Sequence, residues 1–172
     1  MMNKTLIVFL FFISVVNFGW AQKSTVLPGF KQNVEAFANK LEAFECNELD
    51  PLSLNASIVW SKDKSQLAIV MKANLLYGWH IYAYVPKTQP YITSELELEL
   101  PKGITPIGDW IKPLDEAYDG GVYIYHGQLI FIQYCTVNSY NNGDTITSGL
   151  YYQTCDLNKC YPPETKSRVL KL

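Results

Sequence analysis

Two cysteines near the C-terminal end of this 172-residue sequence, Cys155 and Cys160, are separated by only four residues. They follow an aromatic, strand-like stretch and precede Tyr161-Pro162-Pro163. A disulfide that closes so small a loop removes little chain entropy, about 2 kcal/mol, so it is a weak structural staple. The spacing therefore indicates a pair that alternates between dithiol and disulfide.

The surroundings of this pair favour a reactive hairpin. The loop allows the two sulfurs to meet across the mouth of a hairpin, and the prolines keep the exit rigid because proline fixes its own backbone angle. A thiol at the end of a strand is within reach of a partner. The alternative is a permanent clasp in a non-catalytic β-sandwich binding module, and the residues alone leave both interpretations open.

The first 21 residues have the pattern of a secretory signal peptide. Lys4 precedes an apolar run over residues 6–16, and Gly19-Trp20-Ala21 supplies the small residues of a cleavage site. A transmembrane anchor is the alternative, but the apolar run is short and Asn17 and Gly19 interrupt it. We expect cleavage after Ala21 and no stable membrane span. Export places the cysteines in an oxidising compartment.

Charge and motifs exclude several classes of function. Removal of residues 1–21 would leave 151 residues with 13 basic against 16 acidic side chains, which offers no positive field for nucleic acid or for membrane surfaces. The sequence contains neither zinc-ligand spacing nor a Ser-His-Asp elbow nor a phosphate loop, so no metal or cofactor is expected. The expected partner is another protein or a small molecule.

The segment before Asp50-Pro51 is expected to be helical. Apolar residues recur at steps of three and four over residues 30–44, which predicts an amphipathic helix in an N-terminal extension spanning 22–50. We expect this helix to pack on the main body of the protein.

The rest of the chain, residues 51–172, reads as one β domain. Short β runs separated by turn signals are expected at residues 54–60, 66–75, 79–85, 93–100, 122–125, 129–137, 145–153 and 168–172. In the fourth run, leucines alternate with glutamates, which predicts one buried face and one wet face. Strands of this length and spacing predict an all-β, immunoglobulin-like antiparallel β-sandwich with a short N-terminal helix.

Two further cysteines leave a question open. Cys135 lies in an apolar predicted strand, and Cys46 follows the predicted helix. Either the two form a second, structural disulfide that docks the helix, or they are buried free thiols.

Three stretches resemble one known family. Residues 152–156, Tyr-Gln-Thr-Cys-Asp, and residues 160–165, Cys-Tyr-Pro-Pro-Glu-Thr, closely resemble the active-site segment of the N-terminal periplasmic domain of the disulfide reductase DsbD. Residues 78–82 resemble the family's Gly-aromatic-aromatic-aliphatic-Tyr strand, and residues 115–118 resemble its acidic cap loop. The resemblance covers residues 54–172 and is most specific at the cysteines.

The resemblance implies a function, a location and partners. It implies a periplasmic thiol:disulfide interchange protein of the protein-disulfide reductase type, with an immunoglobulin-like fold. Cys160 matches the cysteine that forms a mixed disulfide with partners, and Cys155 matches the one that resolves it. The electron donor would be a membrane-embedded disulfide reductase, and the acceptors would be exported thioredoxin-fold proteins.

The resemblance also implies a set of supporting residues: Asp115, Glu116, Tyr118, His80 and Tyr82. The two acidic residues would handle protons near the cysteines. His80 and Tyr82 point to the same side because residues two apart on a strand share a face, and the resemblance places that face beside the redox pair. The chain departs from better-known members twice: they have five residues between the cysteines, and they have a shielding Phe where this chain has Ala117. Either Tyr118 substitutes for that Phe or the site is open.

Overall fold

The computed structural model describes residues 25–172, which form two antiparallel sheets facing each other. The first sheet has the order β1 (Leu52–Trp60), β2 (Gln66–Leu75), β8 (Gln128–Val137), β5 (Ile104–Ile111). The second has the order β11 (Glu164–Lys171), β9 (Thr145–Tyr152), β4 (Glu95–Glu99). The immunoglobulin-like sandwich with a short N-terminal helix that the sequence predicts is confirmed.

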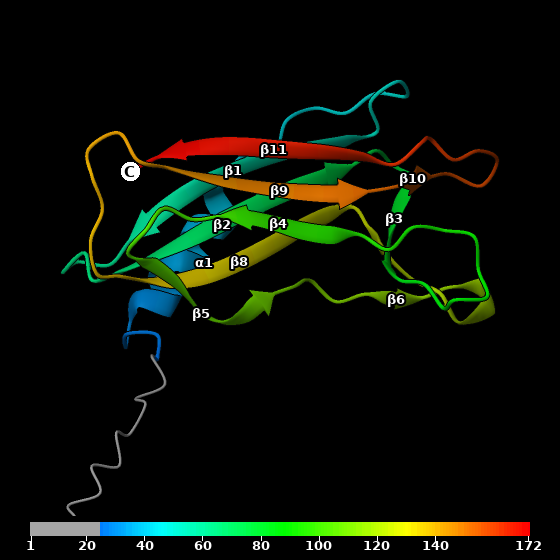
Figure 1. Ribbon diagram of the computed structural model, residues 1–172. Helices are drawn as coiled ribbons and strands as arrows, with labels where there is room; N and C mark the ends of the chain where they lie inside the picture. The colour runs from blue at the N-terminus through cyan, green and yellow to red at the C-terminus, as the bar shows by residue number, and fades with distance from the viewer. Residues whose placement is uncertain (1–24) are drawn as a thin grey trace, which may run out of the picture.

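A third, smaller sheet lies at one end of the sandwich (Figure 1). Its order is β10 (Thr154–Cys155), β3 (His80–Tyr84), β7 (Tyr123–His126), β6 (Glu116–Ala117). A short 3-10 turn, Asp119–Gly121, connects β6 to β7. This end of the molecule carries both Cys155 and Cys160.

The central strand β2 is buried on both faces, which explains its nearly continuous apolar sequence. Leu67, Ile69 and Met71 face the core between the two large sheets. The alternating residues Ala68 and Val70 face outward and are covered by helix α1 (Phe30–Lys40). A strand that is covered on both faces has a continuous run of apolar residues, whereas a strand covered on one face alternates apolar and polar residues. The expected packing of the helix on the body is therefore observed.

Helix α1 ends at Lys40, earlier than the periodicity to Phe44 predicts. From Leu41 the backbone is extended. The carbonyl of Glu42 then accepts a hydrogen bond from the Asn55 side chain at 2.9 Å, and that of Phe44 accepts one from Ser53 at 2.7 Å. These carbonyls bind side chains of β1 and do not accept hydrogen bonds within a helix. The apolar spacing up to Phe44 therefore extends beyond the end of the helix.

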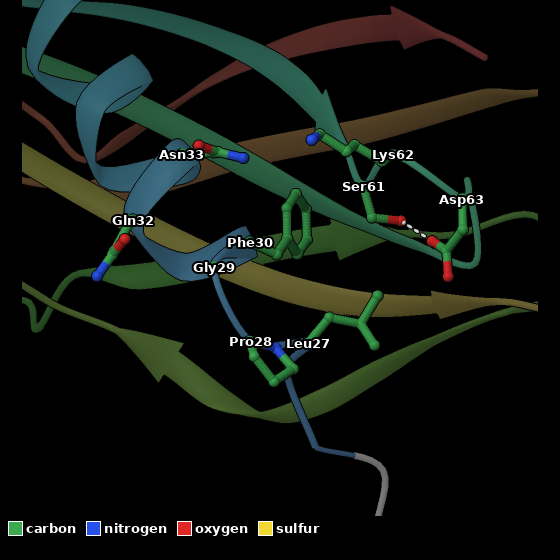
Figure 2. A pocket seen from close by; sticks show the side chains of 9 residues that line it. All are labelled: Leu27, Pro28, Gly29, Phe30, Gln32, Asn33, Ser61, Lys62 and Asp63. Carbon is green, nitrogen blue, oxygen red and sulfur yellow. Dashed lines mark hydrogen bonds between the residues drawn. The ribbon is translucent and has the colours of Figure 1, made fainter.

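The residues before the helix are held by one buried glutamine. The Gln66 side chain accepts a hydrogen bond from the Leu27 N–H at 2.9 Å and donates one to the Thr25 carbonyl at 2.8 Å. Beside this contact lies an open pocket of about 480 Å³ between the start of α1 and the β1–β2 turn, where Ser61 donates a hydrogen bond to Asp63 (Figure 2). This pocket lies away from the cysteine hairpin.

Most predicted strands are found, and β2 has the predicted bounds. In β4 the glutamates are exposed and the leucines half-buried, as their alternation predicts. The sequence did not predict β5, which contains Pro106 and Gly108, and it placed the start of β11 late, because β11 begins with the polar residues Glu164 to Ser167. Within residues 25–172 the helices are too short and too polar to cross a membrane. The predicted signal peptide lies outside the described residues.

Helix docking gives a first prediction. Replacing Phe30, which is buried and packs edge-on against Tyr134 at 5.8 Å, by Ala should lower the free energy of unfolding by about 3 kcal/mol. The Phe44→Ala control, at a side chain that is 50% exposed, should cost less than about 1 kcal/mol. Urea denaturation measures both, and equal losses would contradict this account of the docked helix.

Candidate active site

The cysteine hairpin is closed by hydrogen bonds that do not involve sulfur. The Asp156 carboxylate accepts the backbone N–H groups of Asn158 and Lys159, each at 2.7 Å. The Asp156 N–H donates to the Lys159 carbonyl at 2.9 Å. Asp156 thus forms the local turn that aspartate favours. Cys155 and Cys160, on either side of this turn, are joined by a disulfide.

The two sulfur-bearing residues differ sharply in exposure. Cys155 lies in β10, pairs with β3 and is only 1% exposed. Cys160 lies on the outgoing side of the hairpin and is exposed. Cys160 is therefore the more accessible residue of the pair.

Tyr82 contacts the buried sulfur directly. Its hydroxyl donates a hydrogen bond to the Sγ of Cys155 at 3.0 Å and lies 4.0 Å from the Sγ of Cys160. The Tyr82 ring is buried and stacks on Tyr91, with ring centroids 4.6 Å apart. Burial, followed by the neighbouring phenols, raises the pKa of Tyr82 well above its ordinary value. The hydroxyl therefore keeps its proton at neutral pH and acts as a hydrogen-bond donor.

His80 is the direct cross-strand neighbour of Cys155. The residue is 6% exposed. Its ring contacts Tyr82 edge-on, with ring centroids 5.3 Å apart, and Tyr118, with centroids 5.1 Å apart. Burial is the main cause that lowers the pKa of His80; the nearby Asp156 charge opposes this, and His126 adds to it. The imidazole is therefore neutral at pH 7.

Tyr118 brings the cap segment to the site. Together with the hairpin, His80, Tyr82 and Tyr91, it lines a pocket of about 260 Å³ at the disulfide. Tyr118 itself is 39% exposed, so the aromatic wall it makes is partly open to solvent. Ala117 pairs with Tyr123 in the small sheet and is not part of the pocket lining.

The two predicted carboxylates lie elsewhere. Asp115 and Glu116 are exposed and do not line the pocket. Glu116 instead forms an ion pair with His126, with 2.9 Å between its Oε1 and the imidazole Nε2. The structure therefore brings His80, Tyr82 and Tyr118 together with the cysteines, and a proton-handling role for Asp115 and Glu116 stays a prediction.

Sequence reasoning missed three contributors, Asp156, Tyr91 and Lys159. Asp156 had a readable signal, because an aspartate directly after a strand often caps the next turn. Lys159 lies over the rings of Trp79 and Tyr161, 5.3 and 5.2 Å from their centroids, and those two rings stack at 5.2 Å. Tyr91 comes from a loop, and nothing in its local pattern indicated its contact with Tyr82.

The other two cysteines are not joined. Both Cys46 and Cys135 are free thiols, so the alternative of a second disulfide is wrong. Cys135 is fully buried in β8, and burial raises the pKa of its thiol to about 12. Cys46 is only partly buried, and its Sγ lies 3.0 Å from the Asn74 carbonyl oxygen.

Residues 49–172 match the family described as thiol:disulfide interchange protein DsbD, N-terminal. This chain belongs to that family. The DsbD N-terminal match includes both cysteines of the hairpin and every residue that lines the pocket. Among proteins with curated functions, none matches the chain in sequence.

Several solved structures are similar to this chain, and one of them, with a TM-score above 0.5, supports the fold. The N-terminal periplasmic domain of ScsB from Proteus mirabilis is 19% identical with a TM-score of 0.52, over 75% of this chain, which thus spans 49% of that domain. The DsbD N-terminal domain of Neisseria meningitidis, solved in complex with the PilB N-terminal domain, gives 15% identity and a TM-score of 0.42, over 72% of this chain and 88% of that one. A yeast GGA1 GAE domain gives 15% identity and a TM-score of 0.43, over 76% of this chain and 100% of that one.

No cluster of three or more His, Cys, Asp or Glu side chains suited to a metal ion occurs in the described part of the chain. The chemistry available at the pocket is that of two sulfurs, a phenol that donates a hydrogen bond, and a neutral imidazole.

Cysteine reactivity gives a second prediction. In the native oxidised protein, iodoacetamide should label Cys46, whereas Cys135 should react only after unfolding, because its thiol is buried and hard to ionise. Mild reductant should then add Cys155 and Cys160. Peptide mass spectrometry reads the order of labelling, and native labelling of Cys135 as fast as that of Cys46 would contradict it.

Proposed function

We propose that this protein is an exported thiol:disulfide oxidoreductase that relays reducing equivalents through Cys155 and Cys160. The observation that carries the proposal is the disulfide itself, between one exposed and one buried cysteine, with a tyrosine hydroxyl hydrogen-bonded to the sulfur of the buried one. Membership of the DsbD N-terminal family supports the same conclusion.

Reduction proceeds by two exchanges. A donor thiolate attacks the Sγ of Cys160, the bond between the two cysteines breaks, and its electron pair leaves on the Sγ of Cys155. A second donor thiolate then attacks the donor sulfur of the mixed disulfide and releases Cys160 as a thiolate. The donor pair is oxidised to a disulfide, and two protons convert the cysteines to thiols. Delivery to an acceptor disulfide runs the same steps in reverse.

The pocket favours this assignment of roles. A charged thiolate at Cys155 would be costly in an apolar, buried position. The Tyr82 hydroxyl, 3.0 Å from that sulfur, offsets part of this cost by donating a hydrogen bond to it. Cys155 is therefore suited to leave and to resolve, and Cys160 is suited to attack and be attacked.

The proposed partners follow from the exchange chemistry and the family. The donor is a membrane-embedded disulfide reductase, and the acceptors are exported thioredoxin-fold proteins. The signal-like residues 1–21 support work in the periplasm, in an arrangement of signal peptide, helical extension (22–50) and redox domain (51–172). The competing function is a β-sandwich binding module in which the disulfide never opens.

The reduction potential separates these two functions. In glutathione or dithiothreitol redox buffers, the Cys155–Cys160 pair should equilibrate at a potential between about −180 and −270 mV, where thioredoxin-fold partners exchange electrons. A permanent structural disulfide should lie below about −300 mV. A measured value in that lower range would favour the binding module.

A trapping experiment tests the roles of the two cysteines. In Cys155→Ser the resolving thiol is absent, so a mixed disulfide between Cys160 and an exported thioredoxin-fold partner should accumulate on non-reducing gels. Both variants carry Cys46→Ser, because Cys46 is a partly exposed free thiol. Cys160→Ser, the matched control, should give little adduct because the remaining hairpin thiol, Cys155, is buried. Equal trapping by both variants would contradict the roles, and trapping by neither would favour the permanent clasp.

A further inference from the structure

The proposed exchange leaves one proton without an evident carrier. Each time Cys155 leaves as a thiolate it must gain a proton, and each time it resolves a mixed disulfide its thiol must lose one. Cys160 is exposed and exchanges protons with water, but Cys155 is 1% exposed. Tyr82 holds its own proton tightly, since burial raises its pKa. Another group beside Cys155 is therefore required.

His80 is the titratable group in the right place. Its position in β3 lies directly opposite Cys155 in β10, and residues opposite one another on paired strands have side chains on the same face, with Cβ atoms about 5 Å apart. Both side chains line the same pocket. The Nε2 of His80 is buried and has no hydrogen-bond partner among the described residues. Most buried polar atoms have a hydrogen-bond partner, and this nitrogen is an exception. It is therefore free to exchange a proton.

We propose that His80 carries the proton to and from Cys155. This inference rests on the proposed function. When Cys155 resolves a mixed disulfide on Cys160, the neutral imidazole takes the thiol proton as the Cys155 sulfur forms the new bond and the partner leaves as a thiolate. In the opposite direction, His80 takes a proton from water at the partly open pocket, and the imidazolium passes it to the Cys155 thiolate released by a donor.

The groups around His80 suit both halves of this cycle. Asp156, on the hairpin, favours the imidazolium, whereas His126, on β7, disfavours it and is itself paired with Glu116 of β6. The other titratable groups lining the pocket are Tyr82, Tyr91, Tyr118 and Lys159. Because burial lowers the pKa of His80, the neutral, proton-accepting form prevails at pH 7. Resolution should therefore slow as the pH falls through the pKa of His80.

Stopped-flow reaction of the reduced protein with dithiobis(nitrobenzoate) tests this step. The first equivalent of nitrothiobenzoate reports attack by Cys160, and the second reports resolution by Cys155. The background is Cys46→Ser, because Cys46 is partly exposed. In His80→Gln the second phase should slow about 100-fold at pH 7 and then rise about tenfold per pH unit, as direct thiol ionisation requires. The first phase should stay within about twofold.

The matched control is His126→Gln, which removes the neighbouring imidazole that lies opposite His80 on β7. At pH 7 its second phase should resemble that of the unchanged chain, and its pH profile should shift upward, because His126 helps to lower the pKa of His80. A second phase in His80→Gln with the original rate and pH profile would overturn the role of His80 and leave the proposed function intact. Release of only one equivalent by the unchanged chain would instead overturn the proposed function itself.

A second measurement covers the case in which His80→Gln does not fold. Nuclear magnetic resonance of the imidazole protons gives the titration midpoint of His80 in the otherwise unchanged chain. The second phase should follow that midpoint as the pH is lowered. A second phase that is insensitive to His80 protonation would overturn the proposal.

Discussion

The register of strand β3 against its two short neighbours determines the whole site. On one side β3 pairs with β10, which places His80 opposite Cys155, and on the other side it pairs with β7, which places His80 opposite His126. Tyr82, two residues on, shares the face of His80 and so reaches the same sulfur. A slip of one residue would turn both side chains to the opposite face. The two large sheets thus serve the chemistry by holding this small sheet in one register.

The asymmetry between the two sulfurs follows from that arrangement. Cys155 belongs to a paired strand and is buried beside aromatic rings, whereas Cys160 lies past the turn and is exposed. Under the proposed function, Cys160 therefore meets partners and Cys155 is shielded from them. The proposed exchange requires a hydrogen-bond donor and a proton carrier at the shielded sulfur of Cys155. Strand β3 supplies Tyr82 as the donor and places His80 opposite Cys155.

Much of this was readable in the sequence because strong local patterns coincide with tertiary roles. The spacing of Cys155 and Cys160 indicated that these two cysteines can pair, and the structure joins them in a disulfide. Strand β2 has the bounds that its sequence predicts. Local sequence patterns failed where pairing between distant strands determines the structure. Strand β5 contains Pro106 and Gly108, two residue types that are disfavoured inside strands. It nevertheless pairs with β8, with a shift of register between Ile107 and Ile111. Glu116 was expected beside the cysteines, but its ion pair with His126 depends on a strand pairing that no local pattern encodes.

The hairpin turn has a consequence for the rate of exchange. Asp156 closes the turn through backbone N–H groups, and Tyr161 donates its hydroxyl hydrogen bond to the Glu48 carbonyl at 2.8 Å, so contacts other than the S–S bond hold the two legs. We therefore expect the sulfurs of the reduced protein to remain neighbours, each facing the other at a very high effective molarity. Under the proposed function, attack of Cys155 on Cys160 is therefore faster than encounter with a second partner molecule, and a covalent complex with a partner is short-lived.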